Sequence, residues 1–95
     1  MPTPLTETEL QAALSELHGW RHEDNKLKKD LEFGDFQEAI GFIVRLAFHA
    51  EAQDHHPELF NVYNRVNIEL TTHDAGNKVT TKDVTLARSV ETLLS

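Results

Sequence analysis

The longest periodic segment of the chain runs into a proline, and this ending organises the prediction of the whole fold. Asp35 followed by Glu38 is an N-cap signature, and apolar residues recur after it at helical intervals. Pro57 disfavours the α conformation at His56, so the helix should end shortly before it. The pattern predicts a helix over residues 36–54, which would be the longest element. Its apolar positions are Phe36, Ala39, Ile40, Ile43, Ala47 and Ala50, widened by Val44 and Phe48.

The residues before this helix predict a shorter helix and a hairpin. A capping box at Thr6–Glu9 predicts a helix over residues 7–17. Alternating patterns at 20–23 and 26–33 predict two strands, because Asp24–Asn25 between them tolerates the positive φ of a tight turn.

The residues after the long helix repeat this arrangement in reverse. Residues 60–63 and 66–73 predict a second hairpin that turns at Asn64–Arg65, and His73 would close its second strand. A capping box at Thr80–Asp83 predicts a final helix. We therefore predict an α+β fold in which three helices pack on one face of a four-stranded antiparallel sheet, in the order α-β-β-α-β-β-α.

Composition narrows the functional class. The 95 residues predict one domain over 1–95, and they include no run of about 18 apolar residues that could cross a membrane. A net charge of −7 argues against direct binding to nucleic acid, which needs basic patches. The absence of cysteine excludes disulfide and thiolate chemistry, and without a secretory pattern at the N-terminus the expected compartment is the cytoplasm.

Three histidines are the candidates for chemistry. His55 and His56 lie where the long helix should end, and His73 lies where the last strand should end, so we expect them to share one pocket. Histidine titrates near neutral pH and suits general acid and base catalysis. Glu51 is one helical turn from His55, and together with Asp54 it could orient the imidazoles.

Two other interpretations of these histidines remain open. They could be solvated ends of a helix and a strand, with no chemical role. They could also bind zinc, for which histidine and carboxylate are common ligands, but neighbouring histidines cannot share one helical face and no His-x-x-x-His pair surrounds them. Acid and base catalysis is therefore preferred over metal binding. Because the chain has no cysteine, serine-triad signature or Gly-rich phosphate loop, elimination or hydration chemistry fits it better than acyl or phosphoryl transfer.

The spacing of these residues resembles the signature of the pterin-4a-carbinolamine dehydratases. The matching pattern is Glu51, His55-His56-Pro57 after three residues, Tyr63 after five, His73 after nine and Asp83 after nine more. The resemblance spans about residues 5–94 and is most specific over 51–83. It implies the same α+β fold that the local patterns predict.

The resemblance also implies an activity. Members dehydrate 4a-hydroxytetrahydropterin to quinonoid dihydropterin and water, which recycles the cofactor of aromatic amino acid hydroxylases, and they need no metal or organic cofactor. Members form dimers or tetramers. Some animal members also act as dimerisation cofactors of a homeodomain transcription factor, so protein binding and action on another pterin, such as a molybdopterin-related compound, stay as alternatives.

Residue roles are carried over by the same resemblance. His55 and His73 match the acid and base histidines, and His56 matches a histidine that holds the pterin. Leu59 departs from the aromatic residue, often tryptophan, that many members carry there, which affects the expected affinity more than the reaction. The resemblance further implies substrate-binding positions at Glu51, Asp54, Pro57, Thr71, Thr72 and Asp83, the last as an orienting residue.

Overall fold

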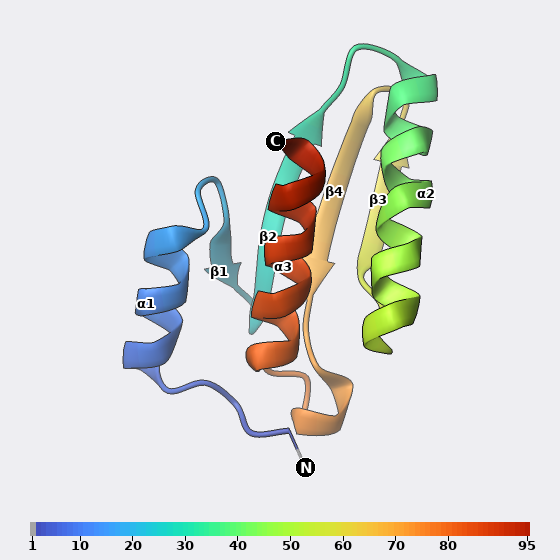
Figure 1. Ribbon diagram of the computed structural model, residues 1–95. Helices are drawn as coiled ribbons and strands as arrows, with labels where there is room; N and C mark the ends of the chain where they lie inside the picture. The colour runs from blue at the N-terminus through green and yellow to red at the C-terminus, as the bar shows by residue number, and fades with distance from the viewer. Residues whose placement is uncertain (1) are drawn as a thin grey trace.

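The computed structural model describes residues 2–95 and confirms the α+β architecture. The helices are α1 (Glu7–Glu16), α2 (Phe36–Gln53) and α3 (Thr81–Leu94), and the strands are β1 (Arg21–Glu23), β2 (Lys26–Glu32), β3 (Glu58–Val62) and β4 (Arg65–Leu70). A short 3₁₀ helix, η1 (His73–Ala75), lies between β4 and α3 (Figure 1). Within residues 2–95, none of the helices combines the length and apolar composition needed to cross a bilayer.

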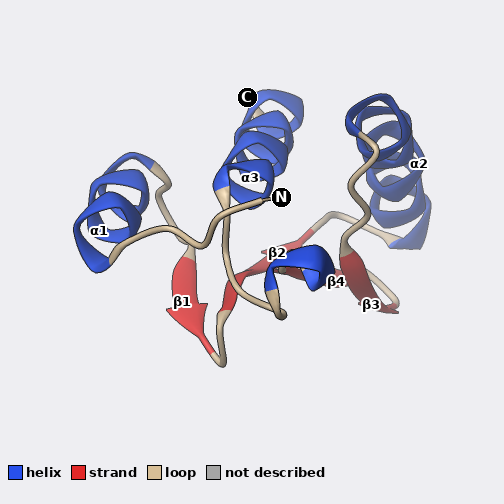
Figure 2. Ribbon diagram, turned by 90° about the horizontal axis from the view of Figure 1, so that it is seen from below, coloured by secondary structure: helices blue, strands red, loops and turns tan. Residues whose placement is uncertain are grey.

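The four strands form one antiparallel sheet in the order β1-β2-β4-β3. All three helices lie on the same face of this sheet, as predicted, and α3 crosses its centre between α1 and α2 (Figure 2). The register pairs Leu27 with Leu70 and Leu31 with Val66, which directs the apolar side chains of the central strands toward the helices.

The three predicted N-caps are confirmed. Thr6 and Thr80 form capping boxes with Glu9 and Asp83, and the Asp35 side chain accepts a hydrogen bond from the Glu38 amide. Helices α1 and α2 each end one residue before the predicted boundary. These starts depend on residues within one turn, which is why local sequence predicts them well.

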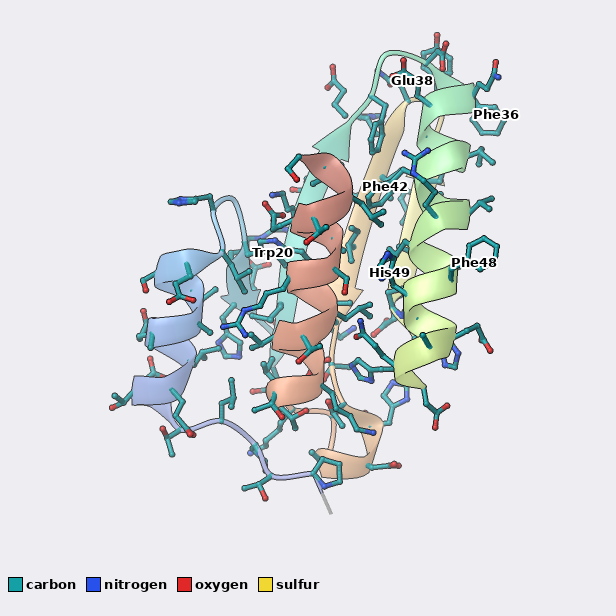
Figure 3. All side chains as sticks on the ribbon, in the orientation of Figure 1. Trp20, Phe36, Glu38, Phe42, Phe48 and His49 are labelled. Atoms are coloured by element: carbon teal, nitrogen blue, oxygen red, sulfur yellow. The ribbon has the colours of Figure 1, made fainter. Side chains whose placement is uncertain are left out.

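The core lies between the helices and the sheet. Phe42 is fully buried and points from α2 into the molecule, where its ring centroid lies 5.2 Å from that of Phe33 (Figure 3). The other fully buried apolar side chains come from β2, β4, α2 and α3: Leu27, Ala39, Leu46, Val66, Ile68, Leu70, Leu86, Ala87 and Val90.

Lys29 is the one polar residue on the inner face of β2, and its surroundings explain why it is tolerated there. Its ammonium group donates to the His18 carbonyl oxygen at 2.9 Å and to Glu91 Oε2 at 2.7 Å. Trp20 Nε1 donates to the same Glu91 oxygen at 2.9 Å, and Lys29 Nζ lies 5.9 Å from the centre of the Trp20 ring. This cluster joins the end of α1 to α3.

The second hairpin differs from the prediction in where it turns and where it ends. The turn lies at Tyr63–Asn64, not at Asn64–Arg65, because Tyr63 adopts a positive φ of 52°. Asn64 is held by Phe33, whose amide donates to the Asn64 carbonyl oxygen and whose carbonyl oxygen accepts from the Asn64 side chain. The predicted turn was wrong because this contact is made by a residue 31 positions away.

The end of β4 was also predicted wrongly, because the strand stops at Leu70 and His73 begins the helix η1 instead of closing a strand. Strand β2 starts at Lys26, so β4 has almost no partner strand beyond Leu70. Thr71 donates instead to the Asn25 carbonyl oxygen, and Thr72 pairs with Lys78. The chain therefore bends where the sequence pattern predicted a straight strand.

Candidate active site

The C-terminus of α2 turns two neighbouring histidines in different directions. Asp54 adopts the left-handed conformation, with φ 50° and ψ 44°, and ends the helix. The His55 amide then donates to the Ala50 carbonyl oxygen at 3.0 Å, which anchors the backbone at this point. The His55 residue is only 8% exposed, whereas the His56 side chain is 60% exposed. The bend thus presents one imidazole to the core and the other to solvent.

A fully buried carboxylate holds His55 from behind. Asp83 Oδ1 lies 2.5 Å from His55 Nε2, and Asp83 Oδ2 accepts from the Thr72 hydroxyl at 2.8 Å and from the Thr80 amide at 2.9 Å. The Thr72 and Thr80 hydroxyls are 2.7 Å apart. Every donor around this carboxylate comes from a different part of the chain, so α3 ties α2 and the end of β4 together at the site.

The directions of these hydrogen bonds follow from the carboxylate, which can only accept. The Thr72 hydroxyl has one proton and donates it in the hydrogen bond to Asp83. In the contact between the two threonine hydroxyls, Thr80 is therefore the donor and Thr72 the acceptor. His55 likewise presents Nε2–H to Asp83, which leaves Nδ1 of the neutral ring as an acceptor. Nδ1 makes no hydrogen bond in the described part of the chain and is not among its buried unpaired atoms, so it is open to a proton donor from solvent or a ligand.

The three candidate histidines meet in one cleft. A hollow of about 260 Å³ lies between the end of α2, the end of β4 and the start of α3. His73 reaches it from η1, whose first residue follows the bend after β4. The cleft is lined by Asp54, His55, His56, Thr71, Thr72, His73, Asp74 and Lys82.

Three predicted site residues lie outside this lining: Glu51, Pro57 and Asp83. Asp83 supports His55 from behind, and Glu51 Oε1 lies 2.8 Å from His56 Nε2 on the exposed surface. The predicted position of Glu51 beside His55 was wrong, because the helix ends at Gln53, before His55. Glu51 does contact a neighbouring imidazole, but it is that of His56. Asp54 lines the cleft but makes no hydrogen bond to either neighbouring histidine.

The cleft also contains two residues that the sequence analysis did not select, Asp74 and Lys82. Lys82 could have been predicted from the sequence. It directly precedes Asp83, the capping-box carboxylate, so it lies in the first turn of α3, at the end of the helix that borders the site. A larger hollow of about 570 Å³ lies near the N-terminus of α2, but no histidine lines it. Within residues 2–95, no group of three or more histidine, aspartate or glutamate side chains is arranged to hold a metal ion.

The fold and the cleft together define a class of protein. It is a small α+β protein in which a buried aspartate fixes one imidazole at the wall of a cleft that two further histidines share. Comparison with known families agrees with this description. Residues 3–93 match the family described as pterin 4 alpha carbinolamine dehydratase, and the chain belongs to this family.

Relatives from several bacteria match almost the whole chain. A protein of Opitutus terrae is 57% identical over 91 residues, which cover 96% of this chain and 94% of the relative. A protein of Solibacter usitatus is 50% identical over 93 residues, which cover 98% and 97%. Both carry the name pterin-4-alpha-carbinolamine dehydratase as a provisional assignment.

Solved structures share the fold. A protein of Brucella melitensis described as a transcriptional coactivator/pterin dehydratase superposes with a TM-score of 0.93 at 41% identity, covering 98% of this chain and 100% of that one. A pterin dehydratase-like protein described as a RuBisCO assembly factor in the alpha-carboxysome superposes with a TM-score of 0.67 at 26% identity, covering 80% and 89%. The descriptions of these neighbours therefore include roles other than catalysis.

Proposed function

We propose that the protein is a 4a-hydroxytetrahydrobiopterin dehydratase, which converts the pterin-4a-carbinolamine to quinonoid dihydropterin and water and so recycles tetrahydropterin. The expected compartment is the cytoplasm. One observation carries the proposal: a buried aspartate holds His55 with its free nitrogen available, in a cleft that also contains His56 and His73. Membership of the dehydratase family supports the same reaction.

The reaction needs one proton donor and one proton acceptor. The bond from ring carbon 4a to the hydroxyl oxygen breaks, and the oxygen leaves as water only if it receives a proton. A ring nitrogen loses its proton as the quinonoid double bond forms. One proton is given and one is taken, so two imidazoles of opposite protonation state suffice, without a metal or an organic cofactor.

The geometry suggests which histidine takes each role. His55 Nδ1 is an acceptor as long as Nε2–H donates to Asp83. His55 is therefore suited to be the base that removes the proton from the pterin ring. His73 lies in η1, on a different part of the cleft wall, and is exposed to solvent. It is suited to be the acid that protonates the leaving hydroxyl. After turnover, transfer of a proton from His55 to His73 through solvent restores both residues.

The remaining lining suits a flat polar ring. Thr71 and Thr72 are buried at the end of β4. The Thr72 amide and carbonyl groups already form hydrogen bonds within the chain, so the backbone of Thr71 is the part that can bind the amide-like edge of a pterin. Asp54 can accept from the amino group of the ring, and His56, held by Glu51, can contact its face or edge. Pro57 disfavours the helical conformation at His56. Its role in the site is therefore to direct the backbone out of α2, not to contact the substrate. A cleft of about 260 Å³ is slightly smaller than the roughly 300–1,000 Å³ of typical small-molecule sites.

A stopped assay of 4a-hydroxytetrahydropterin tests this function. The wild-type protein should accelerate loss of the carbinolamine, and His55→Ala and His73→Ala should each lower the rate without changing the circular dichroism spectrum. His22→Ala is a matched control, because His22 is exposed on β1 and does not line the cleft. No acceleration by the wild-type protein would overturn the proposal.

The outer face of α2 supports self-association as a homodimer or homotetramer. Phe36, Ile40, Val44 and Phe48 recur every four residues and are 51%, 36%, 51% and 73% exposed. The two phenylalanines point away from α3, Phe36 from the first turn of the helix and Phe48 about three turns further along (Figure 3). An antiparallel second copy of α2 would set Phe36 against Phe48 and Ile40 against Val44, so the stripe is complementary to itself.

The same face is the basis of the second candidate function, a protein-binding dimerisation cofactor or coactivator. Val44→Glu places a charge at the centre of the stripe, and sedimentation should show a smaller assembly. If the wild-type protein is a monomer and instead retains an amphipathic helix of another protein through this face, the coactivator role is favoured over self-association. Dehydratase activity on a molybdopterin-related compound, with none on tetrahydrobiopterin carbinolamine, would favour the third alternative.

A further inference from the structure

The side chain and the backbone of Thr72 hold different parts of the candidate active site. The residue is only 3% exposed and directly precedes His73, the first residue of η1. Its hydroxyl donates to Asp83 Oδ2 at 2.8 Å, and the other oxygen of this carboxylate holds the His55 ring. The side chain of Thr72 is therefore bonded directly to the group that orients the proposed base.

The backbone of Thr72 holds residues 73–77, which we call the η1 loop and which carries the proposed acid. The Thr72 carbonyl oxygen accepts from the amides of Ala75 and Asn77, each at 3.1 Å. The Thr72 amide donates to the Lys78 carbonyl oxygen at 3.0 Å, and the two residues form an antiparallel bridge that closes the loop. The position of the η1 loop therefore depends on Thr72.

The η1 loop has no other polar attachment to the site in the part of the chain that the structure describes. None of its side chains forms a hydrogen bond or an ion pair within residues 2–95. All of its residues are exposed except Ala75, which is half-buried, so packing against the core does little to fix it. Thr72 is thus the link between the loop and the buried carboxylate of Asp83.

We propose that Thr72 is a positioning residue that sets the spacing of the two histidines that act as acid and base. Its hydroxyl joins the η1 loop, with His73, to the carboxylate that orients His55, so the two imidazoles keep a fixed separation across the cleft. Thr72 lines the cleft, but its backbone amide and carbonyl are engaged within the chain, so it acts through the histidines. This inference rests on the proposed dehydratase function.

The test compares Thr72→Val and Thr72→Ser in the dehydratase assay. Loss of the hydroxyl should lower kcat roughly tenfold to 10²-fold, because small displacements of catalytic groups are costly. KM should change much less, because the backbone of Thr71 is not altered. Thr72→Ser keeps the hydroxyl and should retain most of the wild-type kcat.

Trp20→Phe is the matched control for a general loss of stability. It removes a hydrogen bond to Glu91, which lies in the last turn of α3, whereas the cleft lies at the first turn. This variant should therefore be destabilised and still keep the wild-type kcat.

Hydrogen exchange gives a second measurement that needs no substrate. The amides of Ala75 and Asn77 donate to the Thr72 carbonyl, so loosening of the η1 loop should speed their exchange in Thr72→Val. Exchange of these two amides should stay close to the wild-type rate in Thr72→Ser and in Trp20→Phe. A purely structural role of Thr72 predicts instead that Thr72→Val and Trp20→Phe speed the same slowly exchanging amides of the core.

Three results would overturn this inference. They are a wild-type kcat in Thr72→Val, an equal loss of kcat in Trp20→Phe, and exchange of the two loop amides that Thr72→Val leaves unchanged. Failure of the proposed function is distinguishable, because exchange is measured without turnover. A wild-type protein that does not dehydrate the carbinolamine, together with faster loop exchange in Thr72→Val, would retain the link between Thr72 and the η1 loop and lose the dehydratase assignment.

Discussion

Replacing Asp83 with asparagine should invert the proton arrangement of His55 while leaving its position nearly unchanged. The asparagine oxygen can still accept from the Thr72 hydroxyl and the Thr80 amide, which together hold one side of the wild-type carboxylate. The amide NH₂ group then faces His55 and donates to Nε2. The neutral ring must place its proton on Nδ1, so the group that should accept the substrate proton becomes a donor.

The expected magnitudes differ for activity and stability. Loss of a general base lowers the turnover number by roughly 10²- to 10⁴-fold. The loss of stability should be about 1–2 kcal/mol, because charge-assisted hydrogen bonds become neutral but each donor keeps a partner. Asp83→Ala would instead leave three donors without an acceptor, at about 1–3 kcal/mol each, which approaches the whole stability of a typical domain.

Three measurements separate these effects. Nitrogen NMR of the imidazole reports which ring nitrogen of His55 carries the proton, stopped kinetics report turnover, and thermal denaturation reports stability. We expect a changed tautomer, a large loss of turnover and a small shift in melting temperature for Asp83→Asn. Wild-type turnover together with the wild-type tautomer would refute the assigned role of Asp83.

Three further predictions concern stability. Thr72→Val removes the hydroxyl donated to Asp83 and should cost about 1–2 kcal/mol, a fall in melting temperature of about 4–16 °C, which Thr72→Ser should largely avoid. Trp20→Phe removes the hydrogen bond to Glu91 and should cost about 1 kcal/mol in urea denaturation, and an unchanged midpoint would contradict the stabilising role of that contact. A hydrogen bond to Glu69 and a second one to Glu58 raise the pKa of Lys26 above its ordinary value of 10.5. The stabilising contribution of Lys26 is therefore full below pH 10.5 and is lost as the pH rises through the pKa of the folded state. The midpoint difference between wild type and Lys26→Met should therefore stay constant up to about pH 10 and shrink as the pH rises above 10.5.

Local signals predicted the helices and the first hairpin because their causes lie within a few residues. The caps at Thr6, Asp35 and Thr80 act inside one helical turn, and Asp24 and Asn25 both adopt the positive φ that their side chains tolerate. The second hairpin was less predictable, since its turn depends on Phe33 and its end depends on where β2 starts.

The contacts of the site depend on the tertiary fold in the same way. Sequence spacing brought Glu51 to attention as the partner of His55, but the partner in the structure is Asp83, 28 residues further along. The sequence left Asp83 as either a helix cap or an orienting residue. The structure shows that its two oxygens do both, one toward the Thr80 amide and the other toward His55.

The most direct test of the account is the rate of carbinolamine dehydration by wild-type protein and by His55→Ala, measured on the same preparation with His22→Ala as control. The account predicts acceleration by wild type and by the control, and a loss of roughly 10²- to 10⁴-fold in the His55 variant with the fold retained. Equal rates for wild type and His55→Ala would contradict it.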